Sequence, residues 1–82
     1  MSASAGGVSR RLRALIAETL GVEESEVVAD ASFEDDLNAD HQELVDLIVA
    51  IEEEFGVKID DAVMGDLETV GDLLEYLDDK LA

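Results

Sequence analysis

Residues 40–56 read D-H-Q-E-L-V-D-L-I-V-A-I-E-E-E-F-G, and this stretch carries the clearest helix signal in the chain. Asp40 is a favoured helix N-cap residue, and Glu43 follows three positions later, as in a capping box. Apolar residues then recur at helical spacing, which predicts one buried face. They are Leu44, Ile48, Ile51 and Phe55, and Val45 and Leu47 widen the face. Gly56 is suited to end the helix in the left-handed conformation.

The same signals predict helices on both sides of this stretch. The first is expected from about Val8 to Leu20, followed by Gly21 as its C-terminal cap. The last begins after a capping pair of Thr69 and Asp72 and runs to about Leu81. Its expected buried residues are Val70, Leu73, Leu74 and Leu77. Residues 60–65 have room for only a short helical turn.

A long acidic segment, residues 22–40, separates the first two predicted helices. Its apolar residues follow no regular period, so at most one short turn is expected, near residues 23–27. Val27, Phe33 and Leu37 are the expected anchors of this segment in the core. Loops of this length without regular structure are uncommon and usually functional.

The chain has 82 residues, enough for one domain. We expect a flexible N-terminus over residues 1–7 and one domain over residues 8–82. No strand pattern is present, so the fold is expected to be all-α: a four-helix bundle with a long first loop and a short third helix.

Charge is the strongest compositional feature, with 22 acidic against 5 basic residues and a net charge of −17. No Lys or Arg occurs between Ala14 and Val57. Such a surface repels nucleic acid and anionic membranes, and a basic protein partner is its natural counterpart. The alternative is that the acidity only maintains solubility. No apolar run reaches the roughly 20 residues that cross a bilayer. We expect a monomer, located in the cytoplasm.

Enzymatic and metal-binding roles find no support in the residues. His41 is the only histidine and there is no cysteine, so neither a catalytic pair nor a zinc ligand set is present. Asp36, Asn38 and Asp40 are spaced like the start of an EF-hand loop. However, the required glycine is replaced by His41 and the required glutamate by Leu47. We therefore predict no catalytic residue, no metal site and no enzyme activity.

Residues 33–55, F-E-D-D-L-N-A-D-H-Q-E-L-V-D-L-I-V-A-I-E-E-E-F, resemble the central motif of acyl carrier proteins. That motif reads F-x-x-D-L-G-A-D-S-L and continues into a helix that ends in E-E-E-F. The similarity extends to about residues 8–80, including Leu20-Gly21-Val22, Asp30-Ala31-Ser32-Phe33 and Thr69-Val70. It implies the family's fold, a four-helix bundle with a long first loop.

The resemblance also implies a cofactor and a site for it. In this family a transferase attaches 4′-phosphopantetheine to the serine of D-S-L, and acyl chains are carried on the thiol of that arm. Here His41 occupies the serine position and Gln42 the position of the following leucine, which usually contributes to partner contact. Because imidazole has no hydroxyl, we predict no bound cofactor at this position.

Two functions follow from the resemblance. The first is a non-carrying relative, an interaction, structural or regulatory subunit that docks its acidic helix on a basic protein. The second is an acyl carrier protein of fatty acid or polyketide biosynthesis whose attachment serine is altered. The face of the helix opposite its buried stripe is acidic around one apolar residue, Val49. The expected partner-binding residues are Asp36, Gln42, Glu43, Asp46, Val49 and Glu53.

Overall fold

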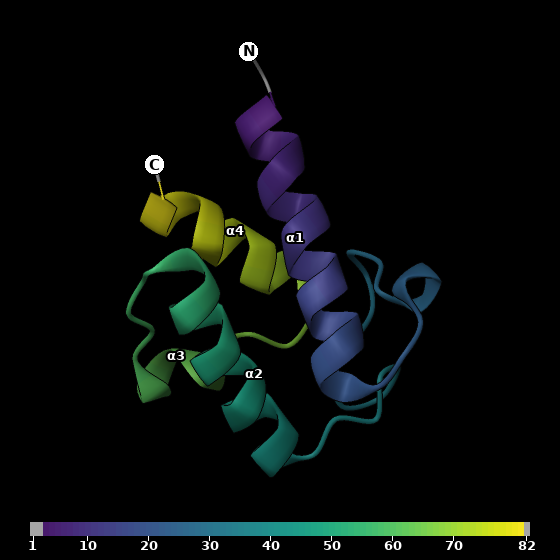
Figure 1. Ribbon diagram of the computed structural model, residues 1–82. Helices are drawn as coiled ribbons and strands as arrows, with labels where there is room; N and C mark the ends of the chain where they lie inside the picture. Colours follow the sequence, from purple (N-terminus) through teal and green to yellow (C-terminus); the bar gives the residue numbers. More distant parts are fainter. Residues whose placement is uncertain (1–2, 82) are drawn as a thin grey trace.

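The computed structural model describes residues 3–81, which form helices joined by loops (Figure 1). The elements in chain order are α1 (Ala3–Leu20), the 3-10 helix η1 (Glu24–Glu26), α2 (His41–Phe55), α3 (Asp61–Met64) and α4 (Val70–Leu81). Within residues 3–81 the only β pairing is an isolated bridge between Ser32 and Thr69. The predicted all-α architecture, with its long first loop and short third helix, is confirmed.

The ends of α2 form as the sequence predicts. The backbone N–H of Glu43 donates to Asp40 Oδ1 at 2.8 Å, and the N–H of Asp40 donates to Glu43 Oε1 at 3.1 Å. These two bonds satisfy donors that a helix start otherwise leaves unpaired. Gly56 ends the helix with φ of 66°, and Gly21 adopts φ of 70° after α1. A glycine takes this conformation without the steric penalty that a Cβ brings.

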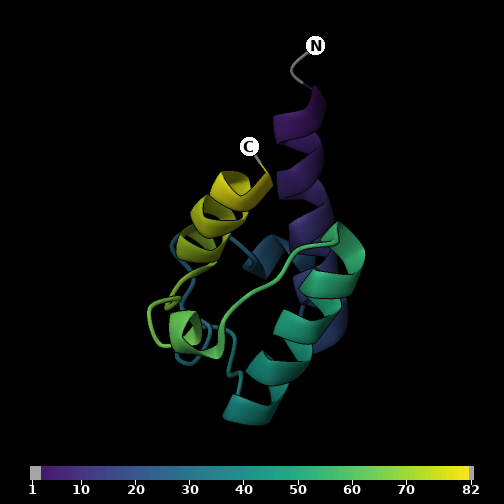
Figure 2. The same ribbon diagram turned by 90° about the vertical axis from the view of Figure 1, so that its left-hand side faces the viewer.

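The core lies where α1 contacts both α2 and α4 (Figure 1). Leu12 and Ile16 of α1 meet buried residues of the other two helices, among them Ile51 and Leu77, which are completely inaccessible to solvent. Figure 2 shows that the start of α1 and the end of α4 lie at the same end of the molecule. The opposite end is formed by the first loop and the start of α2.

The long first loop is attached to the bundle along its whole length. Its predicted anchors, Val27, Phe33 and Leu37, are all buried. On one side Arg13 of α1 donates from Nε to the carbonyl of Val27 and from a terminal nitrogen to the carbonyl of Glu24, both at 3.1 Å. On the other side the N–H of Phe33 donates to the carbonyl of Glu68 at 3.1 Å. The loop therefore holds the start of α2 in a defined position.

The predicted start of the first helix was wrong. The helix was expected from about Val8 after a flexible segment, yet α1 begins at Ala3 and includes residues 3–7 of that segment. Alanines at positions 3 and 5 favour the helix and Gly6 and Gly7 oppose it, so the extension depends on propagation, which adds about one hydrogen bond per residue to an existing helix. Residues 1–2 lie outside the described chain.

Four residues predicted to be buried are only half-buried: Leu44, Val45, Phe55 and Leu74. Leu74 and Leu44 keep part of their surface accessible. The ring of Phe55 packs against the core and is also covered by a charged group, because the Arg11 guanidinium carbon lies 4.6 Å from its centroid. A cation over an aromatic face is a favourable contact that leaves the ring near water.

The acidic surface leads to a prediction about stability. Among the described side chains the one ion pair joins Arg11 to Glu54 at 2.9 Å, so most carboxylates have no cation beside them. Repulsion between them opposes folding and is screened by salt. Raising NaCl to about 0.1 M, where the Debye length is about 10 Å, should stabilise the domain by about 1 kcal/mol. Divalent cations should do so at lower concentration. Thermal unfolding followed by circular dichroism measures this, and a melting temperature independent of salt would contradict it.

Within residues 3–81, no helix combines the length and the apolar character that crossing a bilayer requires.

Candidate functional site

His41 is the first residue of α2, directly after the Asp40 cap, and its side chain is exposed. It borders an open hollow of about 410 Å³ between the start of α2 and the end of α3. The other residues around this hollow are Glu34, Leu44, Val45, Met64 and Gly65. An imidazole on the surface at a helix start is therefore accessible to another protein.

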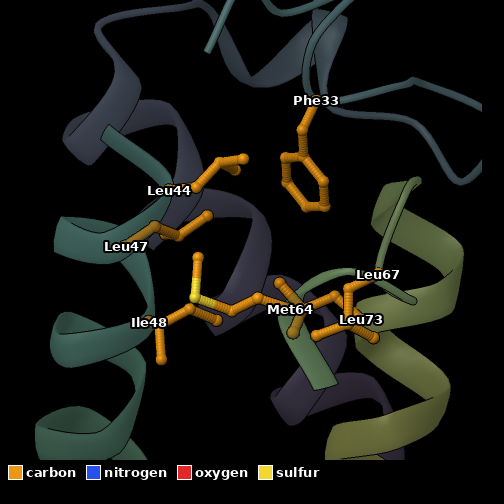
Figure 3. Close-up of a pocket in the computed structure, with 7 residues that line it drawn as sticks. All are labelled: Phe33, Leu44, Leu47, Ile48, Met64, Leu67 and Leu73. Atoms are coloured by element: carbon orange, nitrogen blue, oxygen red, sulfur yellow. The ribbon is translucent and has the colours of Figure 1, made fainter. Parts of the chain in front are cut away.

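A small apolar cavity lies deeper, between α2 and α3. Its volume is about 20 Å³, and it is lined by Phe33, Leu44, Leu47, Ile48, Met64, Leu67 and Leu73 (Figure 3). Figure 3 shows Met64 of α3 reaching between Ile48 of α2 and the leucines near α4. This volume is enough for about one water molecule. However, the apolar side chains that line the cavity offer water no hydrogen bond. Leu44 and Met64 border both the outer hollow and this cavity, so the apolar surface continues inward from His41.

Four of the predicted partner-binding residues lie together on α2. Gln42, Asp46, Val49 and Glu53 are all exposed, and Val49 retains 47% of its surface. We call these four residues the α2 face. Nε2 of Gln42 donates to Asp46 Oδ1 at 3.1 Å, which links the first two residues of this face.

The other two predicted partner-binding residues also have structural roles, of which the cap by Glu43 was predicted and the loop contact of Asp36 was not. Glu43 is half-buried and its carboxylate caps the start of α2. Asp36 belongs to the first loop, where its Oδ2 accepts a 2.7 Å hydrogen bond from the Ser32 N–H. There it lines a shallow hollow with Val28 and Asp30. Glu34 and Met64 at the hollow beside His41 were not predicted, because no local pattern indicates where α3 lies relative to α2.

Hydroxyl groups near the loop have other hydrogen-bonding roles. Ser32 Oγ accepts from the Asp35 N–H at 3.2 Å within the first loop. Thr69 Oγ1 accepts from the Asp72 N–H at 3.2 Å and caps α4. Neither lies at the start of α2. Among the described side chains, no group of three or more His, Asp or Glu residues is placed to hold a metal ion.

Comparison with known proteins gives a consistent result across sequence and structure. Residues 10–77 match the family model described as "Phosphopantetheine attachment site". The chain is 46% identical to the acyl carrier protein of Thermotoga maritima over 79 residues, 96% of this chain and 98% of that protein. It is 44% identical to the acyl carrier protein of Thermosynechococcus vestitus over 75 residues, 92% and 93% of the two chains. A solved structure of the acyl carrier protein from Enterococcus faecalis superimposes with a TM-score of 0.78 at 28% identity, covering 93% of this chain and 96% of that one.

The fold, the capped start of α2 and the family match define a phosphopantetheine-binding carrier domain. Within that class, the chain belongs to the acyl carrier protein family. Proteins of this class are carriers and not enzymes.

The residues present do not fit the family's prosthetic group at the usual position. Attachment of 4′-phosphopantetheine to a serine needs a hydroxyl oxygen at the first residue of α2, and His41 offers only ring nitrogens. Gln42 is polar where the family motif has leucine. The first residue of α2 therefore offers no oxygen with which a phosphodiester could form.

Proposed function

We propose that this chain is an acyl carrier protein of fatty acid or polyketide biosynthesis in its scaffold and docking surface, with the attachment serine altered to His41. In this form it docks on the enzymes of such a system without carrying an acyl group. The observation that carries the proposal is the match to acyl carrier proteins across nearly the whole length of both chains, including the capped start of α2. A cytoplasmic location remains a prediction.

The comparisons favour this second hypothesis of the sequence analysis over the first. Both relatives carry the name acyl carrier protein and are matched at 44–46% identity, so the nearest functional precedent is a carrier. The start of α2 is also well ordered in this chain, with the reciprocal Asp40–Glu43 cap and the buried anchor Phe33 of the preceding loop.

A dedicated non-carrying subunit is the second candidate function. It is supported by the α2 face, where Val49 is exposed between acidic residues. An apolar contact surrounded by charges is typical of a surface that binds another protein. Both candidate functions require docking through α2. In an altered carrier protein only the missing hydroxyl prevents loading, whereas in a dedicated non-carrying subunit other features prevent it as well.

Competition for the loading enzyme tests docking directly. We expect excess parent chain to slow the phosphopantetheinylation of its own His41→Ser variant, because the parent occupies the transferase without being consumed. The measurement is the initial rate of mass gain of the variant at increasing concentrations of parent. A rate that is unaffected by a large excess of parent would show that the α2 face does not engage this partner.

Variants of the α2 face should reduce this competition in two ways. Val49→Asp removes the central apolar contact and should weaken inhibition about fivefold, the equivalent of about 1 kcal/mol. Asp46→Lys and Glu53→Lys should mainly slow association and reduce its salt dependence. None should unfold the domain, because these side chains are exposed. If all three inhibit as the parent does, the docking surface lies elsewhere, and exposed Arg10 on α1 is the next residue to test.

A further inference from the structure

Gln42 and Asp46 form one side-chain unit on the α2 face. The two residues are one helical turn apart and are joined by the 3.1 Å hydrogen bond from Gln42 Nε2 to Asp46 Oδ1. An ionised carboxylate can only accept hydrogen bonds, so the amide nitrogen must be the atom that faces Asp46. The amide oxygen of Gln42 lies on the other side of the same planar group, where it can accept a bond from a partner.

The unit therefore presents two kinds of acceptor close together: the amide oxygen of Gln42 and the remaining oxygen of Asp46. A guanidinium carries five N–H donors in a planar fork and can bond to two acceptors at once. A lysine ammonium is a compact, strongly hydrated charge with three rotatable donors, and it has no rigid planar fork to match two acceptors in fixed directions. We propose that the docking partner presents an arginine to the first two turns of α2, and that Gln42 is the residue that selects arginine over lysine.

The surroundings of this unit support an arginine from outside the chain. Arg11 and Arg13 are bonded elsewhere, Arg11 to Glu54 and Arg13 to loop carbonyls, so neither neutralises Asp46. No Lys or Arg occurs between Ala14 and Val57. Val49 lies three residues after Asp46, close on the helix surface, and is exposed. A guanidinium is more weakly hydrated than an ammonium, so it loses less hydration free energy when it lies beside an apolar side chain such as Val49.

This selectivity is a property of this chain and not of the motif that it resembles. Leucine at position 42 would offer neither a donor to Asp46 nor an acceptor to a partner. The inference rests on the proposed function, because it specifies the chemistry of the partner at the α2 face. The test of arginine selectivity does not depend on loading with phosphopantetheine. The selectivity can therefore be refuted while the proposed function holds, and the reverse is also possible.

The test uses two short basic peptides that differ only in carrying arginine or lysine. Each is titrated into the isotopically labelled chain, and NMR shifts of the Gln42 side-chain amide and the Val49 backbone amide report binding to α2. The arginine peptide should bind about three- to tenfold more tightly, which lies within the range expected for the net contribution of one typical added hydrogen bond. Gln42→Leu should abolish this preference. Glu53→Gln, which removes one charge from the same face, should weaken both peptides and keep the preference.

Two results would overturn the inference. One is equal affinity of the parent chain for both peptides, with shifts on α2, which would leave docking intact and remove the selectivity. The other is a preference for arginine that persists in Gln42→Leu. If neither peptide shifts residues of α2, the inference is wrong, and the competition for the transferase decides separately whether the α2 face docks on an enzyme.

Discussion

The His41→Ser variant should gain one phosphopantetheine unit when it is incubated with coenzyme A and a broad phosphopantetheinyl transferase. The substitution places a hydroxyl on the first residue of α2, directly after the Asp40 cap, which is the attachment position that we propose. The side chain at this position is exposed, so the new hydroxyl is accessible to the enzyme. The change should be close to all-or-none, because the parent residue has no oxygen with which to form the phosphodiester. Intact mass spectrometry measures it.

The double variant His41→Ser, Gln42→Leu separates the hydroxyl from recognition of its surroundings. If only the hydroxyl is missing, the single variant is loaded and the added leucine raises kcat/KM modestly. If the single variant stays unmodified and the double variant is loaded, Gln42 also blocks recognition by the transferase. If neither variant is loaded, the transferase does not recognise the rest of the scaffold either. The chain is then better described as a dedicated non-carrying subunit.

The second large effect is expected in the core, where Phe33→Ala should remove a large part of the protein's free energy of unfolding. Phe33 is 2% exposed, anchors the first loop and lines the cavity between α2 and α3. Replacing a buried Phe by Ala costs about 3–5 kcal/mol, through lost transfer energy and the cavity left behind. Small domains have total stabilities of only about 5–15 kcal/mol.

Urea unfolding followed by circular dichroism measures this loss. Val49→Ala is the matched control, because it truncates an exposed apolar side chain and should change stability by less than about 0.5 kcal/mol. Phe33→Leu, which keeps most of the apolar volume, should lie between the two. A loss below about 1 kcal/mol for Phe33→Ala would show that the loop is not anchored as the structure places it.

Features decided by local chemistry could be predicted from the sequence alone. Asp40 and Glu43 form the expected cap because both partners lie within one helical turn. Gly21 and Gly56 adopt positive φ because each follows the last apolar residue of a helix. The outward position of Val49 follows from the helical period of the buried residues around it.

Features that depend on contacts distant in sequence could not be predicted in this way. Arg13 bonds to loop carbonyls 11 and 14 residues away, and nothing in its neighbourhood distinguishes it from Arg10. Met64 lines the cavity because α3 lies against α2, which the short segment itself does not specify. The bond from the Ser32 N–H to the Asp36 carboxylate spans only four residues and was also not predicted, while the place of Asp36 in the docking surface stays a prediction.

The central claim is that this chain retains the acyl carrier scaffold but cannot be loaded at position 41. The most direct test is the intact mass of the parent chain after incubation with coenzyme A and a transferase that loads the His41→Ser variant under the same conditions. We predict that the mass of the parent stays unchanged while the variant gains one phosphopantetheine unit. A gain of that unit by the parent chain would contradict the claim.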